Sequence, residues 1–262
     1  MPRTTVVSDP RTLLESEGYC VLPGLLNRDE CLRAREAAPS HDNNHSRVMW
    51  DLRLHPNVTK AFATLWGVSP NDLLTSFDGL YDRPPGETFT LPWHIDHNDK
   101  HSTADMTSVQ GLLALSDVNW DTGGTQLLPG SHRRAAELLE RVGPSREEWA
   151  FTEVPEDDAL LTHSGRCAVQ PQLAAGDLLV WDSRTAHRVV AGFDPCSSRC
   201  TAYLSMVPRC FASERVCRER RHGFRDGVAT THWVQRFVDR GGARCRPPPA
   251  VVRDRRVRQM VG

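Results

Sequence analysis

Short runs of hydrophobic residues, separated by turn signals, dominate the middle of the chain. Between residues 72 and 206, apolar runs such as 108–115 and 176–182 alternate with turns rich in glycine and proline at 83–86 and 121–124. Runs of this length, bounded by such turns, are typical of β-strands. The pattern therefore predicts a largely β core over residues 72–206.

Helical spacing is found mainly outside this core. Residues 10–48 predict a helix, a strand and a second helix, and residues 59–66 predict a helix that packs outside the sheet. Residues 133–141 predict a further helix. Residues 147–166 form a long irregular insert, the kind of loop that often acts as a lid near a site. From Arg240 onward, prolines 247–249 favour a tail that is flexible or draped over the surface.

The length of the chain fits one domain. It has 262 residues, of which 39% are hydrophobic and 25% charged, as is ordinary for a globular protein. We expect a single domain over 1–262, with N-terminal additions at 10–70, the β core at 72–206 and a basic C-terminal segment at 207–262. No apolar stretch is long enough to cross a bilayer, and no secretory or peroxisomal signal is found, so a cytoplasmic protein is expected.

Cysteine and charge add two further expectations. The eight cysteines include no Cys-x-x-Cys pair, which favours reduced thiols over disulfides or a structural zinc site. The net charge is −1, yet residues 207–262 contain fourteen arginines against five acidic residues. A nucleic-acid partner is possible for this segment, but a solvated helix with an Arg-rich surface explains the composition more simply.

The most informative chemistry is carried by His94, Asp96 and His187. Side chains at i and i+2 of an extended strand point to one face, so His94 and Asp96 can reach the same metal ion. His187 follows a predicted strand and a bend, where a folded sheet can bring it beside the first pair. Two imidazoles and one carboxylate bind ferrous iron on one face and leave the other positions open. Arg199 could pair with the far carboxylate of a keto-acid co-substrate.

These residues, in this order, resemble the phytanoyl-CoA dioxygenase-like family of iron(II)- and 2-oxoglutarate-dependent oxygenases. Residues 17–26 resemble the family's opening strand, and Asp121-Thr122-Gly123-Gly124 followed by Pro129-Gly130-Ser131-His132 is similar to its segment between the metal-binding stretches. The resemblance covers about residues 12–206. It implies a double-stranded β-helix, or jelly roll, that is mainly β with flanking helices.

The resemblance also implies the chemistry. His94, Asp96 and His187 would bind Fe(II), Arg199 would bind 2-oxoglutarate, and Gln110 is similar to a polar residue on the co-substrate side. Dioxygen and a small organic substrate would complete a hydroxylation that releases succinate and CO2. Related halogenases replace the carboxylate ligand by a small residue, so Asp96 favours hydroxylation.

Several neighbouring residues can be interpreted in more than one way. His97 and His101 could exchange with a ligand, although His97 is expected to face substrate or solvent, and His132 is expected to be structural. The segment 231–233 is similar to a closing element of some relatives, but a core Trp233 explains it equally well. Val189 stands where the family often has a small hydroxyl residue. Trp93, Tyr81 and Trp181 could line the pocket or belong to the core.

Three other functions remain open on the sequence alone. A metal-binding cupin-like isomerase or hydrolase would share the fold and use the ion as a Lewis acid. A non-catalytic protein could bind nucleic acid through residues 207–262. The same metal-binding residues could also serve an oxygenase that modifies a nucleobase. The polar stretch 97–101 hints at a polar substrate, but the substrate and the oligomeric state cannot be predicted.

Overall fold

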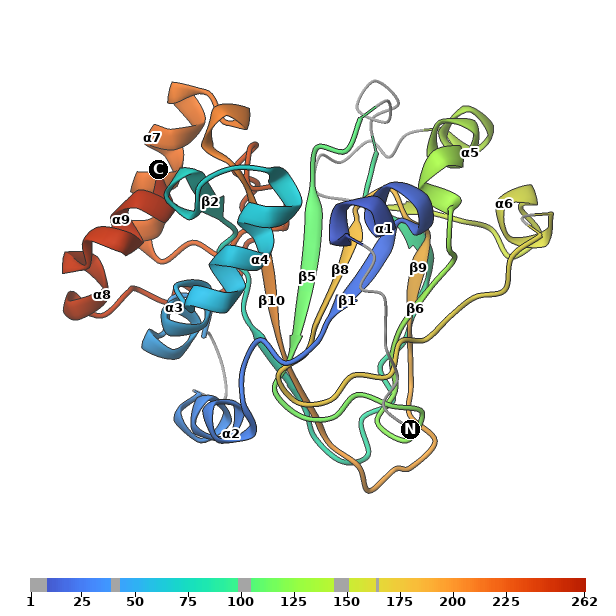
Figure 1. Ribbon diagram of the computed structural model, residues 1–262, viewed down its shortest axis with the longest axis horizontal. Coiled ribbons are helices and arrows are strands. Elements are labelled where there is room, and N and C mark those ends of the chain that lie inside the picture. Colours follow the sequence, from blue (N-terminus) through green and yellow to red (C-terminus); the bar gives the residue numbers. More distant parts are fainter. Residues whose placement is uncertain (1–8, 39–42, 99–104, 144–150, 164) are drawn as a thin grey trace.

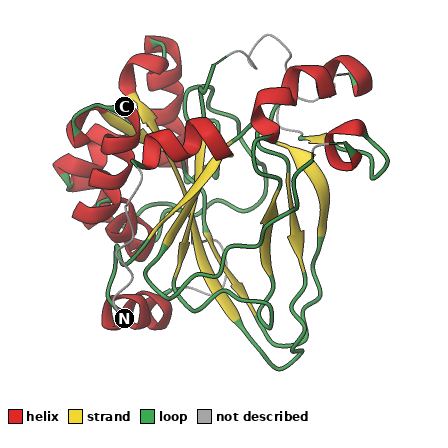
Figure 2. Ribbon diagram, turned by 45° about the vertical axis from the view of Figure 1, so that its right-hand side comes forward, coloured by secondary structure: helices red, strands yellow, loops and turns green. Residues whose placement is uncertain are grey.

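Two antiparallel sheets face each other in the computed structural model, which describes residues 9–38, 43–98, 105–143, 151–163 and 165–262. Figure 2 shows the sheets as separate layers, with helices stacked beside the larger one. The larger sheet has the order β1 (Tyr19–Leu22), β8 (Leu178–Asp182), β5 (Val109–Ala114), β10 (Arg199–Pro208) and β2 (Leu73–Thr75), and β3 (Leu80–Arg83) also pairs with β10. The smaller sheet has the order β6 (Gly124–Leu127), β9 (His187–Val190), β4 (Leu91–Ile95) and β7 (Thr152–Glu153).

Helices flank these sheets (Figure 1). They are α1 (Pro10–Glu17), α2 (Arg28–Ala37), α3 (Arg47–Arg53), α4 (Pro56–Trp66), α5 (Ala135–Val142), α6 (Ala159–Thr162), α7 (Glu214–Asp226), α8 (Pro249–Arg253) and α9 (Arg255–Val261). Helices α3, α4, α7 and α9 gather on the β2 side of the larger sheet, whereas α5 and α6 lie at the opposite side of the molecule. The predicted class, mainly β with flanking helices in a jelly-roll arrangement, is confirmed, although the described strands form two open sheets.

The strands of the larger sheet alternate between a helix-covered face and a face directed at the smaller sheet. On β10, Cys200, Ala202, Leu204 and Met206 are buried in the same core cluster as Phe62 of α4. Side chains at the intervening positions of a strand point the other way. Arg199, Tyr203 and Ser205 therefore face the space between the sheets, where they line a cavity. The hydrophobic pattern thus places the core on one face of β10 and polar groups on the other.

Local sequence signals explain the connections between these elements. Asn27 caps α2, where its side chain accepts a hydrogen bond from the backbone of Glu30 and the Glu30 side chain accepts one from the backbone of Asn27. Gly123 has φ +70° in the turn before β6, and a side chain there would meet the carbonyl oxygen of Val190 at 2.5 Å. The turn needs glycine for both reasons. It fixes where β6 begins to pair with β9, which carries His187.

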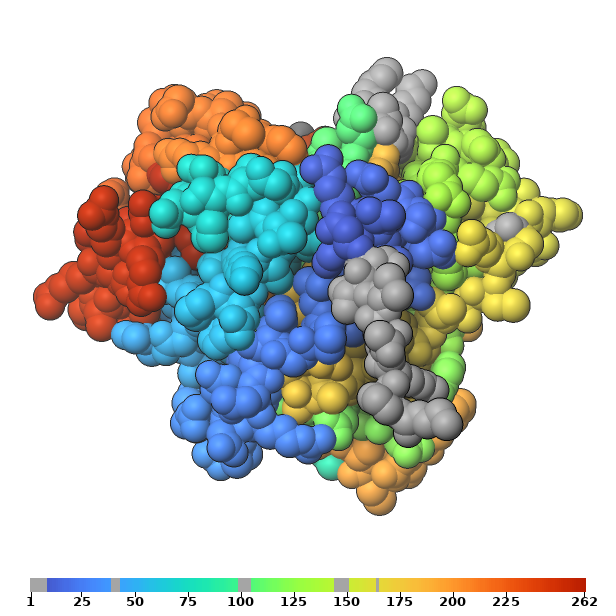
Figure 3. Space-filling model, in the orientation of Figure 1, coloured from blue at the N-terminus to red at the C-terminus, as the bar shows by residue number. Residues whose placement is uncertain are grey.

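The C-terminal residues differ from expectation. The sequence predicts a flexible or surface-draped tail from Arg240, but residues 249–253 and 255–261 form α8 and α9. Val251, Val257, Met260 and Val261 are buried in the main core cluster. Helix α9 contacts β2 and α7. Figure 3 shows the red C-terminal residues packed against neighbouring segments. The prolines at 247–249 indicate a break in regular structure, but the apolar residues after them recur at helical spacing. Burial of these residues stabilises α8 and α9 against the core.

The expected insert is only partly described. Its residues 147–150 and 164 lie outside the described residues. The remainder includes β7, which pairs with β4, and the short helix α6, so it is less irregular than predicted. None of the described helices is both long enough and apolar enough to span a bilayer. The eight cysteines are free in the part of the chain that the structure describes, as expected.

Candidate active site

Two strands of the smaller sheet bring the three predicted metal-binding residues together. His94 on β4 and His187 on β9 are direct cross-strand partners in the antiparallel register. Asp96 lies one residue beyond the end of β4, where its backbone N–H donates to the Ser183 carbonyl oxygen at 2.9 Å. The strand therefore supplies two of the three residues, and its pairing with β9 supplies the third.

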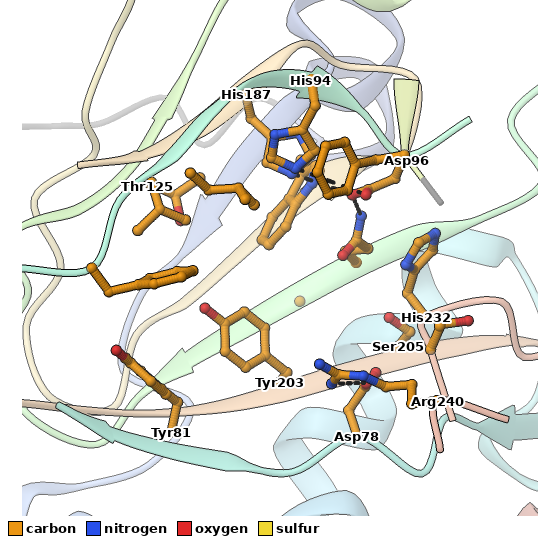
Figure 4. Close-up of a pocket in the computed structure, with 18 of the residues that line it drawn as sticks. Asp78, Tyr81, His94, Asp96, Thr125, His187, Tyr203, Ser205, His232 and Arg240 are labelled. Carbon is orange, nitrogen blue, oxygen red and sulfur yellow. Dashed lines mark hydrogen bonds and ion pairs between the residues drawn. The ribbon is translucent and has the colours of Figure 1, made fainter. Parts of the chain in front are cut away.

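The side chains converge on one point (Figure 4). One potential ligand atom from each of His94, Asp96 and His187 lies within 4.8 Å of the other two. Nε2 of His187 is 3.2 Å from Oδ2 of Asp96, and Nε2 of His94 is 3.9 Å from Oδ1 of the same carboxylate. Both histidines are buried, and Asp96 is mostly buried. Two imidazole nitrogens and one carboxylate at these separations fit a single divalent transition-metal ion.

Hydrogen bonds orient both imidazoles. Nδ1 of His94 lies 2.7 Å from the Pro92 carbonyl oxygen, and Nδ1 of His187 lies 2.9 Å from the Thr185 carbonyl oxygen. A carbonyl oxygen only accepts, so each Nδ1 carries the proton and each Nε2 keeps its lone pair. Those lone pairs face the shared centre. Fixing the free nitrogen in this way is the usual arrangement around metal-binding histidines.

The environment favours neutral histidine and charged aspartate. Burial lowers the pKa of His94 to about 4, and the neighbouring His187 acts in the same direction. Burial alone would raise the pKa of Asp96, but the nearby imidazoles of His187 and His232 lower it overall. These are the protonation states that metal coordination requires.

Gln110 contacts the aspartate. Its side-chain amide on β5 of the larger sheet donates a hydrogen bond to Oδ2 of Asp96. Gln110 also lines the same cavity as the metal-binding residues. The family resemblance implies a place on the co-substrate side. The structure gives Gln110 a position between the two sheets, where it holds the carboxylate, and its contact with a co-substrate stays a prediction.

A cavity of about 520 Å³ separates the sheets at this point. Its walls combine the three metal-binding residues with polar and aromatic side chains from both sheets and from the loop 228–240. The lining residues are Asp78, Tyr81, Phe89, Leu91, His94, Asp96, Gln110, Gly111, Thr125, Phe151, Trp181, His187, Val189, Arg199, Tyr203, Ser205, Thr231, His232 and Arg240. The volume is in the range of small-molecule sites.

Arg199 lies in the cavity wall and has unused hydrogen-bond donors. The residue is 3% exposed, and burial lowers the pKa of its guanidinium. The guanidinium carbon is 6.0 Å from the centre of the Tyr81 ring. Among the described residues, Nε and Nη1 of Arg199 have no hydrogen-bond partner. A buried cation with two unused donors is the chemistry that receives a carboxylate.

The structure also places the other residues that the sequence singled out. His97 is wholly buried against Trp233, with ring centres 4.8 Å apart, so the expectation that it faces substrate or solvent is wrong. Strand β4 ends at Ile95, which removes the alternation on which that expectation depended. His132 is buried and its Nε2 lies 3.1 Å from the Glu15 carbonyl oxygen, a structural position as predicted. His101 lies outside the described residues.

The aromatic residues divide between the cavity and the core. Tyr81 and Trp181 line the cavity, as does Val189. Trp93 is buried in a core cluster with Ile95 and Leu138 and is not among the cavity-lining residues. In the segment 231–233, Trp233 is a buried core residue, whereas Thr231 and His232 line the cavity. The core interpretation of Trp233 is therefore confirmed, and the resemblance to a closing element stays a prediction.

Sequence reasoning missed residues at the far end of the cavity. Asp78, Ser205 and Arg240 line this far end. Phe151 was also missed, but it lies at the metal-binding end, with its ring centre 4.6 Å from that of His94. Ser205 could have been found from its spacing on the strand that begins at Arg199. Asp78 and Arg240 carry no such signal, because they come from loops 162 positions apart in the chain.

Comparisons with known proteins agree with this site. The family model described as phytanoyl-CoA dioxygenase (PhyH) matches residues 34–189. Ava biosynthesis cluster protein O from Aspergillus versicolor is 31% identical over 208 residues, which are 74% of this chain. Those residues cover 65% of that relative, so the chain matches slightly less than two thirds of its length.

Solved structures share the fold at low sequence identity. The epimerase SnoN in complex with Fe3+, alpha ketoglutarate and nogalamycin RO has a TM-score of 0.58 at 16% identity, with 91% of this chain and 92% of that chain covered. A hypothetical protein from Escherichia coli has a TM-score of 0.66 at 15% identity, with 88% and 77% covered.

A third structure is the carbocyclase SnoK, described as non-heme and alpha ketoglutarate dependent. Its TM-score is 0.54 at 18% identity, with 77% of this chain and 84% of that chain covered. At these identities the likeness supports the fold alone. The family model, in contrast, spans more than half of the chain and includes all three metal-binding candidates. This chain therefore belongs to the phytanoyl-CoA dioxygenase (PhyH) family.

Proposed function

We propose that this protein is an Fe(II)- and 2-oxoglutarate-dependent dioxygenase that hydroxylates an unactivated C–H bond of a small organic molecule and forms succinate and CO2. One observation carries the proposal. The metal-binding residues His94, Asp96 and His187 share a cavity with Arg199, a buried cation whose Nε and Nη1 have no partner among the described residues. A metal site beside an unused guanidinium suits a chelating dicarboxylate.

The donor set fits the proposed metal. Two neutral imidazole nitrogens and one carboxylate oxygen would hold Fe(II) and leave coordination positions for other ligands. When bound, ferrous iron with 2-oxoglutarate and dioxygen supplies the oxidising power that no side chain has. His94, Asp96 and His187 fix the position of the ion, and Gln110 fixes the carboxylate of Asp96.

The remaining residues bind and shield the reactants. Arg199 would receive the far carboxylate of 2-oxoglutarate through an unused donor of its guanidinium, and the ring of Tyr81 lies beside the guanidinium. Phe151 and Trp181 cover the two histidines, with ring centres 4.6 Å from His94 and 5.4 Å from His187. These aromatic walls exclude water from the site, which protects a reaction that water would divert.

A rearranging oxidation is the second candidate. Two of the fold neighbours are described as an epimerase and a carbocyclase, and both are alpha ketoglutarate dependent. The same C–H cleavage that begins a hydroxylation could begin either reaction. The mass of the product separates them, because hydroxylation adds one oxygen atom, epimerisation changes nothing and ring closure removes two hydrogens.

A non-oxidative reaction and a nucleic-acid substrate have weaker support. A non-oxidative cupin-like reaction would give no role to the unused donors of Arg199. A nucleic-acid or nucleobase substrate stays a prediction from the arginines of residues 207–262.

The test is the formation of succinate from 2-oxoglutarate by purified protein supplied with Fe(II), ascorbate and a panel of small metabolites. We expect succinate and an oxygenated product in equal amounts. His187→Ala should abolish both, whereas His163→Ala, at an exposed histidine away from the cavity, should change neither. Succinate formation that survives His187→Ala would refute the assignment of the metal site.

A further inference from the structure

The cavity has a second polar end that the proposed chemistry does not use. Figure 4 shows Asp78 and Arg240 across the cavity from the metal-binding residues, with Tyr203, Ser205 and His232 between them. On β10, Arg199 and Ser205 are six residues apart on the same face, which corresponds to about 20 Å of strand. The proposed co-substrate anchor and this second polar end therefore lie at opposite ends of the strand.

Asp78 is the unusual group at this end. It is 7% exposed, and its only ion-pair contact within the described residues is Arg240, whose Nη1 lies 3.7 Å from Oδ1. The Arg240 side chain is 59% exposed, so this pair is loose and partly solvated. Burial raises the pKa of Asp78 to about 6, although Arg240 acts against the rise. A hydrogen bond from the Ser76 side chain and the charge of Arg53 also lower the pKa of Asp78, so burial of the carboxylate is partly compensated. A carboxylate accepts more hydrogen bonds than these, so Asp78 can still receive another donor.

The surrounding backbone holds Asp78 in place independently of a ligand. The guanidinium of the fully buried Arg53 donates a hydrogen bond to the Asp78 carbonyl oxygen. The adjacent Phe77 backbone N–H donates to Thr230 Oγ1 at 2.9 Å, and the Arg240 backbone N–H donates to the Ala229 carbonyl oxygen at 3.0 Å. The loop 228–240 is thereby fixed against residues 76–79. Carboxylate and guanidinium are both presented to the cavity by braced segments.

A further unused polar atom lies between this end and the metal-binding residues, on His232, which also hydrogen-bonds the Asp96 backbone. Nε2 of His232 is buried and has no hydrogen-bond partner among the described residues. His232 and Ser205 both line the cavity between Asp78 and the metal-binding residues. The other walls are apolar or aromatic and include Tyr81, Phe89, Leu91, Phe151 and Val189. A ligand that fits would be mainly apolar, with a polar group at one end.

We propose that Asp78, paired with Arg240, anchors the substrate through a hydroxyl group and selects largely apolar alcohols. A neutral hydroxyl can donate to the Asp78 carboxylate and accept from Arg240, so it uses both members of the pair. An ammonium group could donate to Asp78 but would be repelled by the adjacent guanidinium. This inference rests on the proposed function, because it identifies the substrate of the same cavity.

The test compares rigid probes of similar size. Naphthalenemethanol, its methyl ether, naphthylmethylamine and ethylnaphthalene share a skeleton and differ in the terminal group. Equilibrium dialysis of the full chain, loaded anaerobically with Fe(II) and 2-oxoglutarate, gives a Kd for each probe. We expect the alcohol to bind about tenfold or more tightly than ethylnaphthalene, because a hydrogen bond to a charged group has that effect. The methyl ether, which can accept from Arg240 but cannot donate to Asp78, should bind more weakly than the alcohol.

Variants separate a substrate anchor from a structural ion pair. Asp78→Asn should remove most of the preference for the alcohol. Arg240→Gln removes the cation that lowers the pKa of Asp78, so its probes are measured at pH 8, where the Asp78 carboxyl is ionised and binding of the amine should improve relative to the alcohol. A merely structural pair would respond equally to both variants, with lower thermal stability and no change in the order of the probes. Asp239→Asn is the matched control, since it removes an exposed pair with Arg244 beside the same loop and should leave every Kd unchanged.

The outcomes are distinguishable from those of the proposed function. If the wild-type protein shows no absorption band with Fe(II) and 2-oxoglutarate, the proposed function fails, and dialysis still reports whether Asp78 selects the alcohol. If the band forms but the four probes bind equally, fail to bind, or keep their order in Asp78→Asn, the inference fails alone. Should Asp78→Asn not fold, the opposite shift expected for Arg240→Gln decides the question.

Discussion

At the scale of single residues, Arg199 has an unusual combination of burial and unused hydrogen-bonding capacity. A guanidinium that is 3% exposed, with two nitrogens lacking partners among the described residues, is costly in the absence of an anion. The cost is removed when a carboxylate binds. The sequence alone indicated this arginine by its position after His187, but only the structure shows that its donors are unused.

Loss of this guanidinium should weaken binding of 2-oxoglutarate. Arg199→Gln is expected to raise the KM for 2-oxoglutarate about 10–100-fold, the worth of a hydrogen bond to a charged group, with a smaller effect on kcat. Steady-state succinate formation at varied 2-oxoglutarate measures both values. Arg209→Gln, at an exposed arginine, is the control. An unchanged KM in Arg199→Gln would show that the co-substrate lies elsewhere.

Gln110 acts on the metal through Asp96 in our account. Gln110→Ala removes the hydrogen bond to Oδ2 of Asp96, and loss of such outer contacts typically reduces metal affinity about 10–100-fold. Anaerobic titration with Fe(II) measures the affinity, and Gln172→Ala, outside the cavity, serves as the reference. Equal Fe(II) affinities of Gln110→Ala and the wild type would contradict this positioning role.

At the scale of elements, the two facing sheets supply different residues of the site. The smaller sheet supplies His94 and His187 as cross-strand partners, and the larger sheet supplies Gln110, Arg199 and Tyr203. The larger sheet holds these side chains in fixed positions because its opposite face is packed against α4, where Phe62 is fully buried. Gly111 on β5 makes that approach possible. A side chain there would meet the Leu204 carbonyl oxygen at 2.7 Å and Cζ of Phe62 at 2.9 Å.

This close packing predicts a stability effect. Gly111→Ala should lower the free energy of unfolding by about 1–3 kcal/mol, because the added methyl group overpacks the sheet against α4. Urea denaturation measures the change. Combining Gly111→Ala with Phe62→Leu should recover part of the loss relative to the sum of the single variants. Stability equal to that of the wild type in Gly111→Ala would mean that α4 does not press on β5 as described.

Elements also show the limits of prediction from sequence. Asn27 and Glu30 indicate the start of α2, and Gly123 indicates a turn, because capping and positive φ depend on neighbouring residues only. The sequence misplaces His97 because its direction depends on where β4 ends, which is decided by pairing with β9 and β7. Asp78 and Arg240 could not be found, since tertiary packing alone brings their loops together.

At the scale of the whole molecule, the C-terminal helix completes the main core. The fully buried Arg220 of α7 donates from Nε to the Val261 carbonyl oxygen at 2.7 Å and from Nη2 to the Thr75 carbonyl oxygen at 2.6 Å. It thereby links α7, α9 and β2. The prediction of a flexible tail depends on prolines 247–249 and the arginines. It gives too little weight to the apolar residues after them, four of which are buried in the main core cluster.

Substitutions in α9 test this integration. Met260→Ala should lower the free energy of unfolding by about 2–5 kcal/mol, as for other buried methionines. Arg256→Ala, on the exposed side of the same helix, should change it by less than about 0.5 kcal/mol. Thermal or urea unfolding compares the two variants. A flexible tail would make both substitutions neutral.

The most direct test of the central claim is an anaerobic absorption measurement. Protein mixed with Fe(II) and 2-oxoglutarate should develop a metal-to-ligand charge-transfer band, because His94, Asp96 and His187 leave room for a chelating keto acid on the ion. Asp96→Ala and His187→Ala should weaken or abolish the band, and His163→Ala should retain it. A wild-type protein that binds Fe(II) without forming the band, or a band that survives loss of His187, would contradict the account.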